Sequence, residues 1–94
     1  MAREKKIEQK LMTEVKKAGG IALKFVSPGY AGMPDRLVLI AKSHIAFVEV
    51  KSPNQKPRKL QLSRHRQLEK LGFKVYVLDN ENQIGGIIDE IRTT

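Results

Sequence analysis

The sequence contains no cysteine, so it can form neither disulfide bonds nor metal sites with thiolate ligands. It has no apolar run of about 18 residues, and no signal-peptide core follows its charged N-terminus. We therefore expect no membrane association and a cytoplasmic location.

Acidic residues are scarce relative to basic ones, with 10 Asp and Glu against 18 Lys and Arg and a formal net charge of +8. Such an excess favours association with a polyanion and makes binding strongly dependent on salt. Nucleic acid is the expected partner. A solvated basic surface or a ribosome-like structural protein would carry the same charge, so charge alone leaves these alternatives open.

The chain of 94 residues contains no internal repeat, no low-complexity tract and no domain boundary, so we expect a single domain over residues 1–94. This length is near the lower end of what buries an adequate core alone. A second copy of the chain is therefore a plausible stabilising partner, and we expect a homodimer.

Residues 3–18 have the periodicity of an amphipathic helix that ends at Gly19 and Gly20. Its expected apolar stripe consists of Ile7, Leu11, Met12, Val15 and Ala18. Glu4 and Glu8 fall inside that stripe. Because a carboxylate is costly to bury without a partner, at least one of them should meet a cation or a metal ion. Alternatively, both lie at the edge of the stripe and reach solvent or a nearby lysine.

Three strands are expected over residues 21–26, 35–41 and 44–51, with an irregular loop over 27–34 that contains two glycines and two prolines. The second and third strands should form a hairpin. Both are apolar on both faces at their centres, which is typical of the middle of a covered sheet. The hydrophobic pattern therefore leaves their register undetermined.

Two charged residues, Glu49 and Lys51, alternate with apolar ones near the end of the third strand. Both side chains should project from one face, roughly 7 Å apart along the chain. Asp35 from the neighbouring strand would add a second hard oxygen ligand. Mg²⁺ suits one or two carboxylates completed by water and substrate phosphate, so the arrangement indicates a metal-dependent nuclease. Taken singly, each residue more commonly belongs to an exposed cross-strand pair or a turn.

The length of the hairpin connection decides whether the two acids meet, because directly opposed residues of an antiparallel pair share a face. Asp35 lies beside Glu49 only if the connection spans three residues, Ala41 to Ser43, or contains a bulge. A two-residue turn would send Asp35 to the other face. We predict the odd-length connection or a bulge.

A polar, basic loop over residues 52–59 contains two prolines and cannot form a sheet interior. A helix over residues 59–71 should follow it. Its periodicity predicts an inward stripe of Leu60, Leu68 and Leu71. Gln61 and His65 fall at the margin of that stripe, so Gln61 could face the site.

The last strand, over residues 73–78, should cross over right-handedly and lie parallel to a strand of the same sheet. A terminal helix is marked by the i, i+3, i+4, i+7 spacing of Ile84, Ile87, Ile88 and Ile91. His44 and His65 have neither metal-ligand spacing nor a nucleophile to serve, so we interpret both as surface or packing residues.

The order helix, three strands, helix, strand, helix, with its acids followed by Lys and Gln, resembles the PD-(D/E)XK nuclease superfamily. More narrowly, nearly the whole chain is similar to the VRR-NUC (virus-type replication-repair nuclease) domain. The similarity is carried by Glu8, Gly19-Gly20, Lys24-Phe25, residues 27–36 and 47–51, Gln61, and Leu71-Gly72 before residues 75–77. It implies an α/β, restriction-endonuclease-like fold: an αβββαβ core with a mixed central sheet flanked by helices, plus a C-terminal helix.

The resemblance also implies a Mg²⁺ or Mn²⁺ site and no small-molecule cofactor. Asp35 and Glu49 would bind the ion, and the Val50 carbonyl would be a further ligand. Glu8 would be a direct or water-mediated ligand. These residues would form the metal site of the enzyme.

Two further residues complete the implied catalytic set. A phosphodiester is anionic, so hydroxide approaches it slowly unless a cation neutralises its oxygens. Lys51 would orient the attacking water or stabilise the charge that builds up in the transition state. Gln61 would hold the water or an oxygen of the scissile phosphate.

Several cations flank the predicted site and could bind phosphates without reading bases, namely Lys24, Arg36, Lys56, Arg58 and Lys59. The family further implies branched DNA such as a four-way junction as substrate, a homodimer, and a phage or prophage role in replication and repair. Two alternatives stay open. One is a non-catalytic basic nucleic-acid-binding module with the same fold, and the other is an enzyme acting on RNA or on linear ends.

Overall fold

The computed structural model of the chain describes residues 2–93. Its elements are α1 (Ala2–Lys17), β1 (Gly20–Lys24), β2 (Arg36–Ile40), β3 (His44–Val50), α2 (Lys59–Lys70), β4 (Lys74–Leu78), a 3₁₀ turn η1 (Glu81–Gln83) and α3 (Ile84–Arg92). The predicted order of helices and strands is confirmed. The first strand is shorter than expected, because Phe25 and Val26 belong to the loop that follows it.

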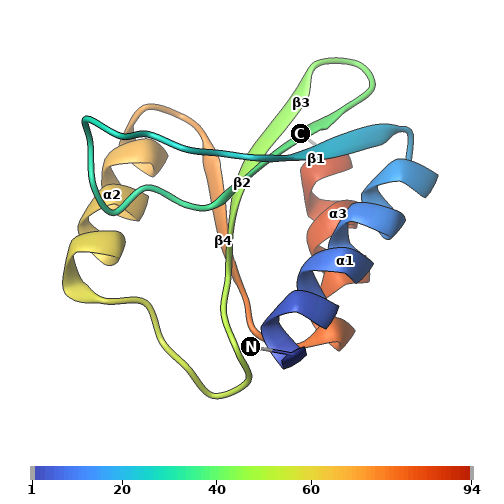
Figure 1. Cartoon of the computed structure of the whole chain (residues 1–94). Helices are drawn as coiled ribbons and strands as arrows, with labels where there is room; N and C mark the ends of the chain where they lie inside the picture. The colour runs from blue at the N-terminus through green and yellow to red at the C-terminus, as the bar shows by residue number, and fades with distance from the viewer. Residues whose placement is uncertain (1, 94) are drawn as a thin grey trace.

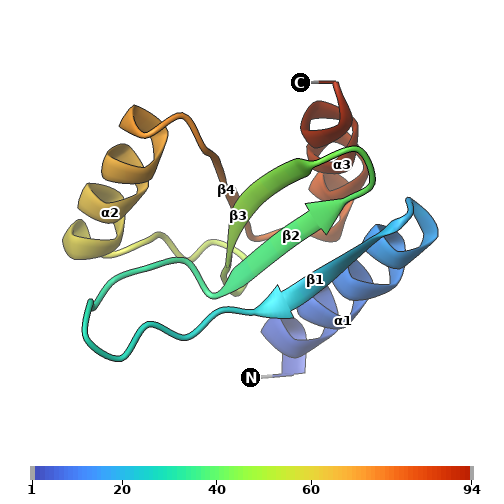
Figure 2. The ribbon, with the colours of Figure 1, turned by 90° about the horizontal axis from the view of Figure 1, so that it is seen from above.

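The four strands form one mixed sheet in the order β1-β2-β3-β4. Neighbouring strands are antiparallel from β1 to β3, whereas β3 and β4 are parallel and are connected through α2. Figure 2 shows β1 and β2 side by side between α1 and α2. The predicted α/β class, with a mixed sheet flanked by helices and a C-terminal helix, is confirmed.

Helices α1 and α3 lie together on one face of the sheet, and α2 lies on the other (Figure 1). The main core is between the sheet and the α1–α3 pair. Its largest fully buried side chains include Leu11, Val15, Val38, Val48, Leu78, Ile84 and Ile91. Among residues 2–93 no helix is both long enough and apolar enough to cross a membrane.

Two apolar stripes differ from their prediction. Met12 of α1 is 41% exposed, so the buried stripe of that helix is narrower than expected. On α2, Leu60 and Leu71 are exposed, whereas Gln61, His65 and Leu68 are buried. The predicted stripe was therefore right for Leu68 and wrong for Leu60 and Leu71, because α2 turns a mixed polar and apolar face toward the sheet.

The β2–β3 hairpin has the three-residue connection that the site requires. Ile40 pairs with His44, which leaves residues 41–43 as the connection, and both Lys42 and Ser43 adopt positive φ. At the other end of the hairpin Arg36 pairs with Val48. The same register, continued by one residue, brings Asp35 opposite Glu49, so the predicted odd-length connection is confirmed.

Candidate active site

The backbone fixes Asp35 at the point where the chain enters β2. Pro34 is fully buried, and Oδ1 of Asp35 accepts a hydrogen bond of 3.0 Å from the backbone N–H of Val50. Burial raises the pKa of Asp35, the hydrogen bond from Val50 opposes this rise, and the charge of Glu8 adds to it. Asp35 is thus held against the end of β3 in an environment that disfavours its charge.

Glu49, in β3, is 4% exposed and shares its surroundings with Asp35 and Lys51. Burial, followed by the charge of Asp35, raises the pKa of Glu49 to about 7, while the nearby Lys51 ammonium lowers it. The Nζ atom of Lys51 lies 4.0 Å from Oε2 of Glu49. Two mutually repelling, partly desolvated carboxylates would gain from a bound cation, because it would stabilise both charges at once.

Gln61 projects from the first turn of α2 onto the Glu49 carboxylate. Its Nε2 donates a 3.1 Å hydrogen bond to Oε2 of Glu49, and its Oε1 accepts one of 2.8 Å from the backbone N–H of Arg58. In the second bond, the side chain at the third helical position caps the backbone at the start of the helix, and this bond orients the amide. Gln61, predicted at the margin of the apolar stripe, is thus buried and faces Glu49.

His65 is the residue that sequence reasoning missed. It is 6% exposed, and its Nε2 lies 3.6 Å from Oε1 of Glu49. Burial lowers the pKa of its imidazole, so the ring is disposed to be neutral. The only available signal was its position, one helical turn after Gln61 and so on the same face. We interpreted His65 as a surface or packing residue; it is a packed residue, and its ring lies beside the candidate ligand Glu49.

Glu8 meets a cation, as predicted for at least one acid of α1. Its Oε2 accepts a hydrogen bond of 2.9 Å from Nε of Arg36 and lies 2.8 Å from Nη2 in an ion pair. Arg36 is 8% exposed, and its Nη1 also donates to the carbonyl of Ala22. The expected phosphate contact of Arg36 is therefore corrected, because its guanidinium is buried and already occupied.

Glu4, the other acid of that stripe, lies farther toward the start of α1. Its Oε1 accepts a hydrogen bond of 3.4 Å from Ser52, just beyond the site. The charge of Glu4 contributes to the raised pKa of both Asp35 and Glu49. Glu4 thus adds negative potential at the site.

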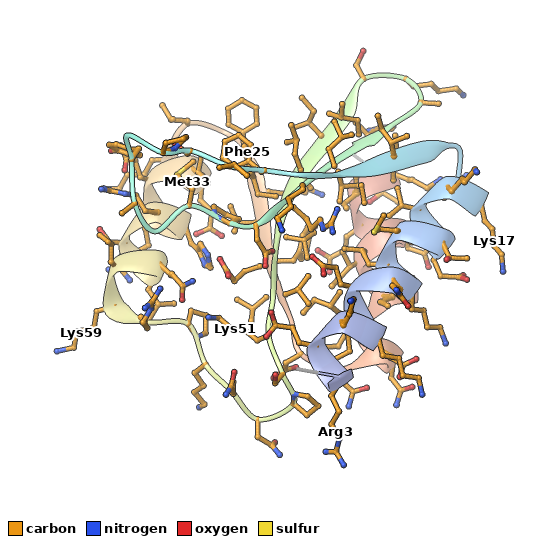
Figure 3. All side chains as sticks on the ribbon, viewed as in Figure 1. Arg3, Lys17, Phe25, Met33, Lys51 and Lys59 are labelled. Atoms are coloured by element: carbon orange, nitrogen blue, oxygen red, sulfur yellow. The ribbon has the colours of Figure 1, made fainter. Side chains whose placement is uncertain are left out.

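The remaining predicted phosphate contacts are exposed cations. Lys56, Arg58 and Lys59 lie in the loop after β3 and at the start of α2, and Lys24 ends β1. The charge of Arg58 lowers the pKa of Glu49, which places it within electrostatic reach of the acids. In Figure 3, Lys51 lies between α2 and α1, whereas Lys59 points away from the molecule.

The loop before Asp35 is attached to α2 by polar contacts. The hydroxyl of Tyr30 donates to Oε1 of Gln67 at 2.9 Å, and Nε of Arg64 donates to the carbonyl of Ala31 at 2.8 Å. The guanidinium of Arg64 also stacks over the Tyr30 ring, 3.8 Å from its centroid. These contacts hold the loop that leads into Asp35.

The donor set suits a hard divalent cation with few protein ligands. Within residues 2–93, no three His, Asp or Glu side chains are grouped so that they could hold a metal ion together. One oxygen of Glu8, Oε2, is held by Arg36 and is not available to a metal ion. Asp35 and Glu49 nevertheless fit Mg²⁺, which is commonly bound through one or two carboxylates and completed by waters and phosphate. Burial and mutual repulsion at these two acids are consistent with such a cation.

Comparison with known proteins gives matches of the same kind in sequence and in structure. The VRR-NUC domain family matches residues 4–81. A protein named "Putative nuclease p44", from Acyrthosiphon pisum secondary endosymbiont phage 1, is 51% identical over 82 residues, covering 87% of this chain and 88% of its own length. A solved structure titled "VRR_NUC domain" matches with a TM-score of 0.86 and 32% identity, over 93% of this chain and 95% of its own. The chain therefore belongs to the VRR-NUC family of nuclease domains.

Proposed function

We propose that the protein is a Mg²⁺- or Mn²⁺-dependent endonuclease that hydrolyses DNA phosphodiester bonds. The observation that carries this proposal is the meeting of Asp35, Glu49 and Lys51 at one end of the β2–β3 hairpin. Two carboxylates there repel each other beside an ammonium group, which is a suitable setting for a divalent cation and an anionic substrate.

In this proposal Asp35, Glu49 and the carbonyl of Val50 hold the metal ion. Glu8 acts through a water molecule, because Arg36 holds its Oε2 atom. When bound, the cation neutralises phosphate oxygens and lowers the pKa of a bound water. The hydrogen bond from Val50 to Asp35 keeps the ligands at the ends of two neighbouring strands in register.

Two side chains of the site would act on the water and the phosphate. Lys51 is only 17% exposed at its side chain and carries its charge next to Glu49, so it can orient a water or stabilise negative charge in the transition state. Gln61 has its amide oriented by Arg58, and we propose that it positions the water or a scissile-phosphate oxygen. Lys51 and Gln61 thereby organise the reacting atoms.

The DNA backbone would follow the exposed cations around the site. Lys56, Arg58 and Lys59 lie beside it, and Lys24 lies at the end of the edge strand. Such contacts position a duplex without reading its sequence. We propose branched DNA, such as a four-way junction, as the preferred substrate. The phage source of the similar protein supports our proposal that this protein acts in the cytoplasm of a bacterial or phage-infected cell.

We also propose that the protein acts as a homodimer. An exposed row of apolar residues supports this, because Ile21, Leu39 and Ile45 are cross-strand neighbours on the α2 side of the sheet. Ile21 is 51% exposed and Ile45 40%, and the neighbouring Leu23 is 43% exposed. A contiguous apolar surface of this kind is typical of a protein interface. A two-fold dimer would present two sites to the two strands of a branched substrate.

The test compares the purified protein on a four-way junction, linear duplex, single strand and RNA, each with Mg²⁺, Mn²⁺ or EDTA. We expect cleavage of the junction with metal and none in EDTA. Asp35→Ala should cut at least about a hundredfold more slowly, because it removes a ligand of the charge-stabilising cation. Gel filtration of the same samples measures the oligomeric state.

The competing function is a non-catalytic binding module, favoured by the net charge of +8. A module would bind these nucleic acids with steep salt dependence and would cut none of them with either metal. Cleavage that persists unchanged in Asp35→Ala would show instead that the chemistry had been assigned to the wrong residues.

A further inference from the structure

The Glu49 carboxylate has one oxygen with a hydrogen-bond partner and one without. Oε2 accepts from Nε2 of Gln61, whereas Oε1 is buried and has no partner among residues 2–93. Nε2 of His65 is also buried and without a hydrogen bond in the same part of the chain. These two atoms lie 3.6 Å apart, so each is in a position to become the hydrogen-bond partner of the other.

Leaving both atoms unpaired would be unfavourable, because a buried polar group without a partner loses its hydration with no compensation. A shift of a few tenths of an ångström would bring the 3.6 Å separation within hydrogen-bond distance. His65 is only 6% exposed, so water does not readily replace Glu49 as its hydrogen-bond partner. The geometry thus favours a direct Nε2–H to Oε1 bond.

Helix α2 is suited to supply both donors. Gln61 and His65 are one helical turn apart and lie on the same buried face of the helix. Gln61 contacts Oε2 and His65 faces Oε1, so one helix face addresses both oxygens of a single carboxylate. An ionised carboxylate has about four lone-pair sites, so these two bonds leave acceptor positions for a cation.

We propose that His65 is a positioning residue for the metal ligand Glu49, donating Nε2–H to Oε1 so that Gln61 and His65 together fix the carboxylate for a divalent cation. This inference rests on the proposed function and adds a residue to it. Partners that hydrogen-bond a ligating carboxylate orient it, and their loss typically costs about 10- to 100-fold in metal affinity or activity.

The test measures Mn²⁺ binding by calorimetry without DNA, in the parent protein, His65→Leu and His65→Gln. His65→Leu removes the donor, and its Mn²⁺ Kd should rise by about 10- to 100-fold. His65→Gln keeps an N–H donor with similar reach and should stay close to the parent. Thermal melts of the three proteins establish that the variants are folded. A folded His65→Leu that binds Mn²⁺ as tightly as the parent overturns the proposal.

A measurement on the parent protein does not depend on how the variants fold. The ¹⁵N chemical shifts of the His65 ring report which nitrogen carries the proton. A proton on Nε2 in the metal-free protein supports the proposal, and a ring protonated only on Nδ1 overturns it. Electron spin-echo spectra of the Mn²⁺ complex show whether the His65 imidazole coordinates the ion directly. Direct coordination by an imidazole nitrogen would also overturn the proposal. If the parent binds no Mn²⁺ at all, the proposed function itself fails.

Discussion

Arg36 holds Glu8 through two nitrogens, Nε at 2.9 Å and Nη2 at 2.8 Å from the same carboxylate oxygen. Its third nitrogen donates to the carbonyl of Ala22 at 3.1 Å. The residue that directly follows Asp35 therefore connects α1, β1 and β2 from the core side of the sheet. Arg36 is adjacent to the site in sequence, but its contacts are structural, so its replacement should change stability.

Replacing Arg36 should affect stability before it affects DNA binding. Arg36→Leu leaves the part-buried carboxylate of Glu8 without its cation and should lower the free energy of unfolding by about 1–3 kcal/mol, below the range for fully buried pairs. Urea unfolding at neutral pH measures this change.

The matched control is Lys56→Ala, which removes an exposed cation. Its stability should change by less than about 0.5 kcal/mol. In DNA binding, Lys56→Ala should reduce the salt slope by about 1. An Arg36→Leu protein as stable as the parent would contradict the structural role of the ion pair.

Removing the ammonium of Lys51 should separate chemistry from metal binding. In Lys51→Met we expect cleavage to fall by about 10²- to 10⁴-fold, the usual contribution of a group that positions or transfers a proton. Mn²⁺ binding should be retained, because the amine is not a ligand. Single-turnover cleavage and calorimetry measure the two quantities. Lys16→Met, an exposed lysine of α1 outside the site and the proposed DNA contacts, is the control, and cleavage at the parent rate by Lys51→Met would refute the assignment.

The raised pKa of Glu49 predicts how stability depends on pH. Its carboxyl has a pKa of 4.5 when unfolded and about 7 in the folded protein, so the folded state binds more protons between these values. In EDTA this residue should therefore lower the free energy of unfolding as pH rises from about 4.5 to about 7.

Glu49→Gln removes this effect. We expect the variant to be more stable than the parent at pH 8 by about 1–3 kcal/mol, with a much smaller difference near pH 4. Chemical unfolding at both pH values measures the difference. Saturating Mn²⁺ should stabilise the parent and not the variant, since only the parent retains the ligand. If the free energy of unfolding had the same pH dependence in the two proteins, the charged form of Glu49 would not be destabilised by its surroundings.

In the loop before Asp35, substitution by alanine should be destabilising at one glycine and tolerated at another. Gly32 has φ +87°, and a Cβ there would lie 2.7 Å from Cγ of Leu60. Gly32→Ala should therefore cost about 1–3 kcal/mol of stability and slow cleavage by displacing the segment that leads to Asp35. Gly29→Ala, with no atom near its added Cβ, is the control. Melting and cleavage assays on the pair test this, and equal behaviour of the two variants would contradict it.

The sequence alone determined the features that depend on local spacing. Period-two alternation placed Glu49 and Lys51 on one face. The hydrophobic pattern did not fix the hairpin register, and we predicted the three-residue connection, which the structure has, from the requirement that Asp35 meet Glu49. The order of the elements and the class of the fold followed from hydrophobic periodicity, turn residues and the VRR-NUC resemblance. These features are predictable because they depend on neighbours in the chain.

Only the tertiary structure decided which partner each polar side chain has. The periodicity of α2 predicted Leu60 and Leu71 inside, but the helix turns Gln61 and His65 inward, because its contact is with a carboxylate at the end of a strand and not only with an apolar surface. The sequence suggested that Arg36 is an exposed cation that contacts phosphate, whereas the fold buries it. Rotation of a helix and burial of a charge are decided by residues distant in sequence, and so the local pattern could not reveal them.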